Sequence, residues 1–273
     1  MRGLILLALL SDLAVGLTVP VYPRKRGVVP GVAIYSCTQA GTIALTFDDG
    51  PFVYTNSVLD QLAAVGFKAT FFVNGYNIGN IADYQSTVTR MVDEGHQIAS
   101  HTYGHPNLVG LQDFDIEQQM SLLGNELSYM IGKYPLYMRP PYFSFNERTL
   151  QVLGQLGYKV IIADIDTNDW RYSSGGVEPS LAAFNSGLKN GGSIVLMHDV
   201  HQNTVDNILP LIISETLQSG KRAVTVGECL GDPETNWYRV DGFPTATTNT
   251  TNGQGVPVNH TPVPEVISWM NYE

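Results

Sequence analysis

The sequence predicts an α/β fold with parallel strands, and we expect a distorted (β/α) barrel of about seven strands. Short apolar runs alternate with amphipathic helical patterns along most of the chain. A glycine stands at or just past the end of the helical patterns, where a left-handed residue commonly ends a helix. Polar residues follow directly after the apolar runs. A doubly wound sheet has the same alternation, but a barrel explains most simply why these polar residues gather at one end.

Each expected element has bounds that follow from this pattern. The expected strands are 42–46, 69–73, 97–100, 136–139, 159–163, 193–197 and 223–226. The expected helices are 55–65, 82–93, 113–131, 146–156, 181–189 and 204–219. In either parallel architecture a ligand binds beyond the carboxyl ends of the strands, which we call the rim.

The first residues are typical of a secretion leader. Arg2 precedes an apolar run over residues 4–10, and small residues at 14–16 offer a cleavage site. The run is too short to span a bilayer, which disfavours a membrane anchor. The basic residues 24–26 indicate pro-segment processing or, equally, a solvated charge run.

We therefore expect four parts along the chain. They are a signal peptide over 1–18, a pro-segment over 19–26, one domain over 27–240 and a flexible tail over 241–273. The tail is rich in Thr, Asn, Gly and Pro and carries glycosylation sequons at Asn249 and Asn259.

Charge restricts the partners. Loss of residues 1–26 removes four basic residues and one acidic residue, which shifts the formal net charge from −10 to −13. An acidic protein is a poor match for nucleic acid or anionic lipid and is compatible with a neutral or cationic polymer. We expect a secreted monomer, extracellular or in the cell wall, with no membrane span.

The chain has only two cysteines, Cys37 and Cys229, at the two ends of the predicted domain. An oxidising compartment favours a disulfide between them. The alternative is a pair of buried thiols.

Asp48 and Asp49 end the first expected strand and precede a Gly-Pro turn. Neighbouring carboxylates repel each other unless a cation holds them. Alternation along the strand would point the two in different directions, so that one could bind a metal while the other handles a proton. A solvated Asp-Asp-Gly turn is the alternative.

His101 and His105 follow the third expected strand. Gly104 and Pro106 argue for a tight loop rather than a helix at this place. Two histidines and a carboxylate, with coordination left open, form a pattern typical of hydrolytic zinc sites, although loop histidines are often merely solvated. Further polar or aromatic residues follow the later strands: Arg139, Asp166, Trp170, His198 and Asp199.

Five motifs between residues 41 and 232 give the chain a family resemblance. It resembles the polysaccharide deacetylases of carbohydrate esterase family 4, the NodB-homology domain, and is most similar to fungal secreted chitin deacetylases. The motifs are TFDDGP at 46–51, HTYGH at 101–105, RPPY at 139–142, DTNDW at 166–170 and LMH at 196–198.

The resemblance implies a metal-dependent hydrolase that removes acetyl groups from chitin or chitin oligosaccharides. By this resemblance Asp49, His101 and His105 hold a divalent metal, with Zn²⁺ expected first and Co²⁺ as the alternative. Asp48 is then the general base on the attacking water.

The resemblance also implies the remaining roles. His198 is the general acid, Asp166 orients it or raises its pKa, and Arg139 pairs with the base.

Three further residues are expected to bind the substrate. The backbone N–H of Tyr142 would stabilise the developing oxyanion, and Trp170 with Leu196 would receive the acetyl methyl group. Outside the motifs such apolar residues would be core residues.

Several other functions remain as alternatives. Peptidoglycan or acetylxylan deacetylation would use the same residues, and a catalytically silent cell-wall-binding barrel would not need the base and the acid. No G-x-S-x-G motif occurs, which disfavours a serine hydrolase. A non-haem iron oxygenase could also use two histidines and a carboxylate.

Overall fold

The structure is a computed structural model that describes residues 27–243. The expected signal peptide, the pro-segment, residues 244–273 of the tail, and both sequon residues, Asn249 and Asn259, lie outside the described residues. Within the described part, no helix has the length and apolar character needed to cross a membrane.

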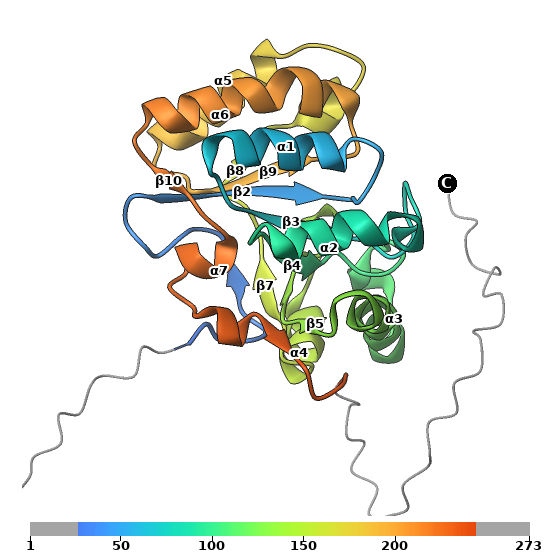
Figure 1. The fold of residues 1–273 in the computed structure, drawn as a ribbon. Coiled ribbons are helices and arrows are strands. Elements are labelled where there is room, and N and C mark those ends of the chain that lie inside the picture. The colour runs from blue at the N-terminus through green and yellow to red at the C-terminus, as the bar shows by residue number, and fades with distance from the viewer. Residues whose placement is uncertain (1–26, 244–273) are drawn as a thin grey trace, which may run out of the picture.

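One sheet of parallel strands forms the centre of the domain (Figure 1). The strands run in the order β1-β7-β6-β4-β3-β2-β9-β8, and β10 also pairs with β2. The sheet is a distorted (β/α) barrel, as predicted, and it is open because β1 and β8 stand at opposite ends of this order. The bounds are β1 Ala33–Ile34, β2 Thr42–Asp48, β3 Ala69–Val73, β4 Gln97–Ser100, β6 Tyr137–Met138, β7 Lys159–Ile161, β8 Ile165–Asp166, β9 Ile194–His198 and β10 Arg222–Ala223.

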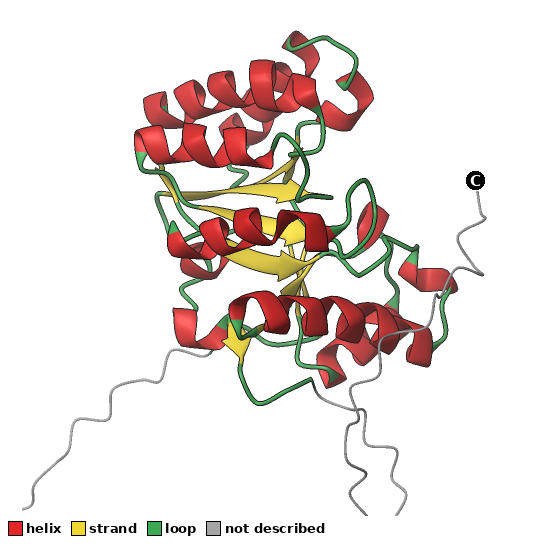
Figure 2. Cartoon of the chain, turned by 45° about the vertical axis from the view of Figure 1, so that its right-hand side comes forward, coloured by secondary structure: helices red, strands yellow, loops and turns green. Residues whose placement is uncertain are grey.

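Helices cover the outside of this sheet (Figure 2). Neighbours in the layer follow the order α5, α6, α1, α2, α3 and α4. The bounds are α1 Thr55–Val65, α2 Gln85–Asp93, α3 Asp113–Ile131, α4 Glu147–Gln155, α5 Glu178–Lys189, α6 Leu209–Gln218 and the short α7 Val226–Cys229. Shorter turns are η1 Ile81–Tyr84, η2 Leu108–Gly110, η3 Pro141–Phe143, η4 Asp169–Tyr172, η5 Thr204–Ile208 and η6 Glu234–Asn236, and β5 Tyr134–Pro135 pairs with β11 Tyr238–Arg239.

The central strand β2 is buried on both faces. Leu45 and Phe47 belong to the core between the sheet and the helices, whereas Ala44 belongs to a second core with Phe72 and Tyr137. A strand covered on both sides reads as a continuous apolar run, which is what the sequence contains here. The two cores fix the strand ends that carry the candidate site.

The predicted elements differ from the structure mainly where strands are very short. The expected strand 223–226 is wrong beyond its first residue, because Thr225 caps α7 by accepting a hydrogen bond from the N–H of Glu228. Strands β1 and β8 were not expected, since two residues are too few to show an alternating pattern.

The predicted disulfide between Cys37 and Cys229 is present. It joins positions 192 residues apart. The backbone N–H groups of Thr38 and Gln39 donate to the carbonyl oxygen of Cys229, which holds the two segments side by side. The bridge therefore connects the segment before β2 to the segment after β10.

We predict that a Cys37→Ser/Cys229→Ser double variant loses about 2–5 kcal/mol of unfolding free energy, because a long closed loop restricts the unfolded chain. Urea denaturation with and without reductant measures this loss. Reductant should lower the denaturation midpoint of the wild type and leave that of the variant unchanged. An equal midpoint for the wild type and the variant without reductant would contradict the prediction.

Candidate active site

The side chains singled out in the sequence meet at the rim. Asp48 ends β2 and His198 ends β9, and the parallel ladder pairs these two residues directly. The loop with His101 and His105 follows β4, and Arg139 follows β6. Polar residues at or just after the ends of these four strands therefore lie together at the rim.

Asp48 and Asp49 are separated by a backbone turn rather than by strand alternation. The strand ends at Asp48, and Asp49 adopts a left-handed φ of 75°. His105 has a φ of 56°, and the other four described non-glycine residues with positive φ also lie in rim loops: Thr102, Tyr142, Phe143 and Asn168. Such conformations cost about 1–3 kcal/mol each and cluster at functional sites.

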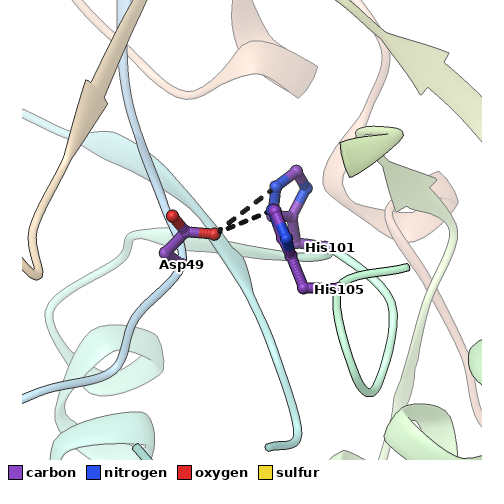
Figure 3. Close-up of side chains that lie close together, drawn as sticks. All are labelled: Asp49, His101 and His105. Atoms are coloured by element: carbon purple, nitrogen blue, oxygen red, sulfur yellow. Dashed lines mark ion pairs between the residues drawn. The ribbon is translucent and has the colours of Figure 1, made fainter. Parts of the chain in front are cut away.

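Asp49, His101 and His105 point toward one another (Figure 3). The Nε2 atom of His105 lies 3.2 Å and that of His101 3.7 Å from Oδ1 of Asp49. Ligands of a tetrahedral metal with bonds of about 2.1 Å are roughly 3.4 Å apart. The donor set therefore fits a divalent cation such as Zn²⁺.

Hydrogen bonds outside this cluster orient both imidazoles. Nδ1–H of His101 donates to the carbonyl oxygen of Arg139 at 2.7 Å, which fixes the tautomer and leaves Nε2 with a free lone pair. Nδ1 of His105 lies 3.1 Å from the hydroxyl of Tyr142. A bond from each ligating histidine to an outer oxygen is typical of metal sites.

Burial controls the charge of the cluster. It lowers the pKa of both His101 and His105 to about 3, so both rings are neutral near pH 7. Burial also raises the pKa of Asp49 to about 6, partly opposed by His198. Neutral imidazoles and an ionised carboxylate are the forms that bind metals.

Arg139 is completely buried beside Asp48. Its Nη1–H donates to Oδ1 of Asp48 and to the hydroxyl of Thr46, both at 2.7 Å. Burial raises the pKa of Asp48, and the guanidinium of Arg139 opposes that rise. The predicted pairing of these two residues is present in the structure.

His198 contacts Asp169, not Asp166. Nδ1–H of His198 donates to Oδ1 of Asp169 at 2.8 Å, and its backbone N–H donates to Oδ2 at 2.7 Å. Burial acts to lower the pKa of His198, but the Asp169 carboxylate outweighs it, and the pKa rises to about 9. His198 is therefore an imidazolium near pH 7.

The predicted role of Asp166 in orienting His198 is wrong. Asp166 is exposed, and its carboxylate accepts a hydrogen bond from the backbone N–H of Asn168. Asp166 pairs with Leu196 in the ladder between β8 and β9, and the chain then turns at Asn168, whose φ is 53°. This turn brings the Asp169 carboxylate, rather than that of Asp166, to His198. The motif DTNDW contains both acids. Its second acid, Asp169, was therefore visible in the sequence as a candidate partner of His198.

The three residues expected to bind the substrate differ in their exposure to solvent. Tyr142 is 70% exposed and Trp170 is 47% exposed, with the guanidinium of Arg171 4.7 Å from the Trp170 ring centroid. Leu196 is buried in β9. Their roles toward a substrate stay predictions.

Asn77 is a further residue of the site that was not predicted from the sequence. Its amide donates to Oδ1 of Asp49 at 3.2 Å, the same oxygen that faces both histidines. A single asparagine in a loop has no sequence signal of this kind.

Comparison with known proteins gives concordant similarities. Residues 35–161 match the family described as polysaccharide deacetylase. A chitin deacetylase of Pestalotiopsis sp is 48% identical over 82% of this chain and 75% of its own length. A probable peptidoglycan-N-acetylglucosamine deacetylase of Arthroderma benhamiae is 50% identical over 82% of this chain, which spans only 52% of that relative. The solved structure of the chitin deacetylase from Colletotrichum lindemuthianum matches with a TM-score of 0.75 and 42% identity, over 78% of this chain and 97% of that one.

We predict that Asp169→Asn lowers the pKa of His198 from about 9, because the carboxylate that stabilises the imidazolium most is lost, while burial and the carboxylates of Asp48 and Asp49 remain. NMR titration of the histidine ring protons measures this pKa. Asp166→Asn is the matched control and should leave the His198 titration in place. A shift caused by Asp166→Asn and not by Asp169→Asn would contradict the assignment.

Proposed function

The chain belongs to the polysaccharide deacetylase family, and we propose that it hydrolyses the N-acetyl groups of N-acetylglucosamine units in chitin or chitin oligosaccharides. The products are acetate and a glycan with free amines. Three relatives named as chitin deacetylases support this substrate, since they are 42% to 48% identical over about four fifths of the chain. One arrangement of the structure supports it most: a metal-ligand cluster, a buried carboxylate and a charged histidine share the rim.

We propose that Asp49, His101 and His105 hold the metal, with zinc as the native ion. A divalent cation there would polarise the acetamide carbonyl and lower the pKa of a water ligand from about 15.7 to about 7. Asn77 and the carbonyl of Arg139 hold two of these ligands in place.

Asp48 is the proposed general base. It is 3% exposed, and its Oδ2 lies 3.7 Å from Nε2 of His101, so it faces the same space as the ligands. Arg139 holds Oδ1, which leaves Oδ2 to accept a proton from the attacking water. Burial keeps the carboxylate basic, while Arg139 keeps it ionised.

His198 is the proposed general acid. An amine leaves only when its nitrogen is protonated, and the imidazolium of His198 can supply that proton. Asp169 fixes Nδ1, so the proton to be transferred is the one on Nε2. Asp169 is therefore a positioning residue that also keeps the acid charged.

The substrate contacts complete the proposal. The backbone N–H of Tyr142 would donate to the oxygen that becomes negative as the water attacks, and Trp170 with Leu196 would accommodate the methyl group. Pro140 and Pro141 restrict the backbone on which that donor lies.

We also propose that the protein is secreted and acts as a monomer outside the cell. The leader pattern and the disulfide support secretion. Peptidoglycan is the second candidate substrate, because a relative named for it is 50% identical.

We predict that the purified protein releases acetate from chitin oligosaccharides, that a chelator abolishes the release and that added Zn²⁺ restores it. Asp48→Asn should lower the turnover by about 10² to 10⁴-fold, because the amide cannot accept the proton. Asp115→Asn, an exposed acid on α3, is the control and should have wild-type turnover.

Parallel assays on acetylated peptidoglycan and acetylxylan separate the alternatives. Faster acetate release from either of these glycans than from chitin oligosaccharides would identify that glycan, rather than chitin, as the substrate. Full activity after both chelation and the Asp48→Asn change would overturn the mechanism. No release from any acetylated glycan would favour a silent wall-binding barrel.

A further inference from the structure

Asp199 is a buried acid next to the site with no role so far. It follows His198 at the end of β9 and is 1% exposed. Among the described residues, no Lys, Arg or His forms an ion pair with it. A buried carboxylate without a cation is costly, so its contacts need an explanation.

The contacts of Asp199 lie on the segment after Asp49. The hydroxyl of Thr55 donates to Oδ2 of Asp199 at 2.5 Å, and the same hydroxyl accepts the backbone N–H of Phe52 at 2.8 Å. Thr55 is fully buried and is the first residue of α1. Asp199 therefore fastens the loop between β2 and α1 to the end of β9.

Gly50 is shaped to receive this carboxylate. A Cβ atom at position 50 would lie 2.3 Å from Oδ2 and 2.4 Å from Oδ1 of Asp199. The φ of Gly50 is not in the left-handed region, so the backbone itself would accept another residue there. The close approach of Asp199 is what requires glycine.

The sheet holds this loop from the β3 side only, where the backbone N–H of Asn74 donates to the carbonyl oxygen of Gly50 at 3.0 Å. The ladder between β2 and β9 ends at the pair Asp48 and His198, and Asp49 then leaves the sheet with its left-handed φ. Beyond that pair, the Asp199 carboxylate takes over as the connection between the two strand ends. The end of β2 leads to Asp49, the predicted metal ligand, and the end of β9 carries His198, the predicted acid.

We propose that Asp199 is a positioning residue that holds the backbone of Asp49 and Gly50 against the end of β9, and so sets the place of the Asp49 carboxylate relative to His198. This proposal rests on the proposed function for its catalytic consequence. Its structural part concerns the metal-ligand cluster alone.

The test compares three variants of the full chain by zinc affinity, measured by chelator competition, and by kcat and KM for acetate release. Asp199→Ala should weaken zinc binding and lower kcat, each by about tenfold or more, with KM within about threefold of the wild type. Asp199→Asn should stay within about threefold on both measures, because its amide oxygen still accepts from Thr55 and fills the same space. Asp206→Ala, an exposed acid in η5, is the control for a lost surface charge and should change neither measure.

Further variants at Thr55 and Gly50 keep the test decisive if Asp199→Ala does not fold. Thr55→Val should also weaken zinc binding. Thr55→Ser, which keeps the hydroxyl, should bind zinc as the wild type does. Gly50→Ala should be impaired by its clash with the carboxylate, and the Gly50→Ala/Asp199→Ala double variant should bind zinc more tightly than Gly50→Ala alone.

Several outcomes would overturn the proposal. They are unchanged zinc affinity in folded Asp199→Ala or Thr55→Val, an Asp199→Asn variant as impaired as Asp199→Ala, and additive effects of Gly50→Ala and Asp199→Ala. The zinc measurements need no turnover. A wild type that binds zinc but releases no acetate would refute the proposed function while still testing Asp199.

Discussion

The buried guanidinium of Arg139 is the interaction on which the rest of the site depends. It donates to Asp48 and Thr46 of β2 and to the carbonyl oxygen of Ile162 beyond β7, and it stacks 4.1 Å from the ring centroid of Phe72 in β3. An unpaired buried charge costs several kcal/mol, so these strand ends must stay together to satisfy it. The backbone carbonyl of the same residue orients His101, which links the base to the metal ligands.

Around this ion pair, backbone turns rather than strand geometry assign the roles. The left-handed φ of Asp49 brings its carboxylate to both histidines, and the left-handed φ of His105 places a second imidazole beside the first. Burial then separates the titrating groups, because it keeps the imidazoles of His101 and His105 neutral while Asp169 keeps His198 charged. As a result, the imidazoles of His101 and His105 are neutral while that of His198 is protonated.

The sequence predicted the parts of this arrangement that depend on periodicity and on motif order. Long buried strands such as β2 and long helices such as α3 have patterns that identify them, and the strand ends place Asp48 and His198 at one rim. The partner of His198 depends on how the chain turns at Asn168, and the contacts of Asn77 and Asp199 depend on loop conformation. Such contacts between residues distant in sequence leave no local pattern, which is why they appeared only in the structure.

Metal content tests the division of labour between the two acids most directly. Asp49→Ala and Asp48→Asn, purified and equilibrated with equal zinc, are compared by elemental analysis. Asp48→Asn should retain close to one ion per chain, and Asp49→Ala should retain little, because of the two acids only Asp49 faces both histidines within ligand distance. Zinc retained by Asp49→Ala and lost from Asp48→Asn would show that the two acids have each other's roles.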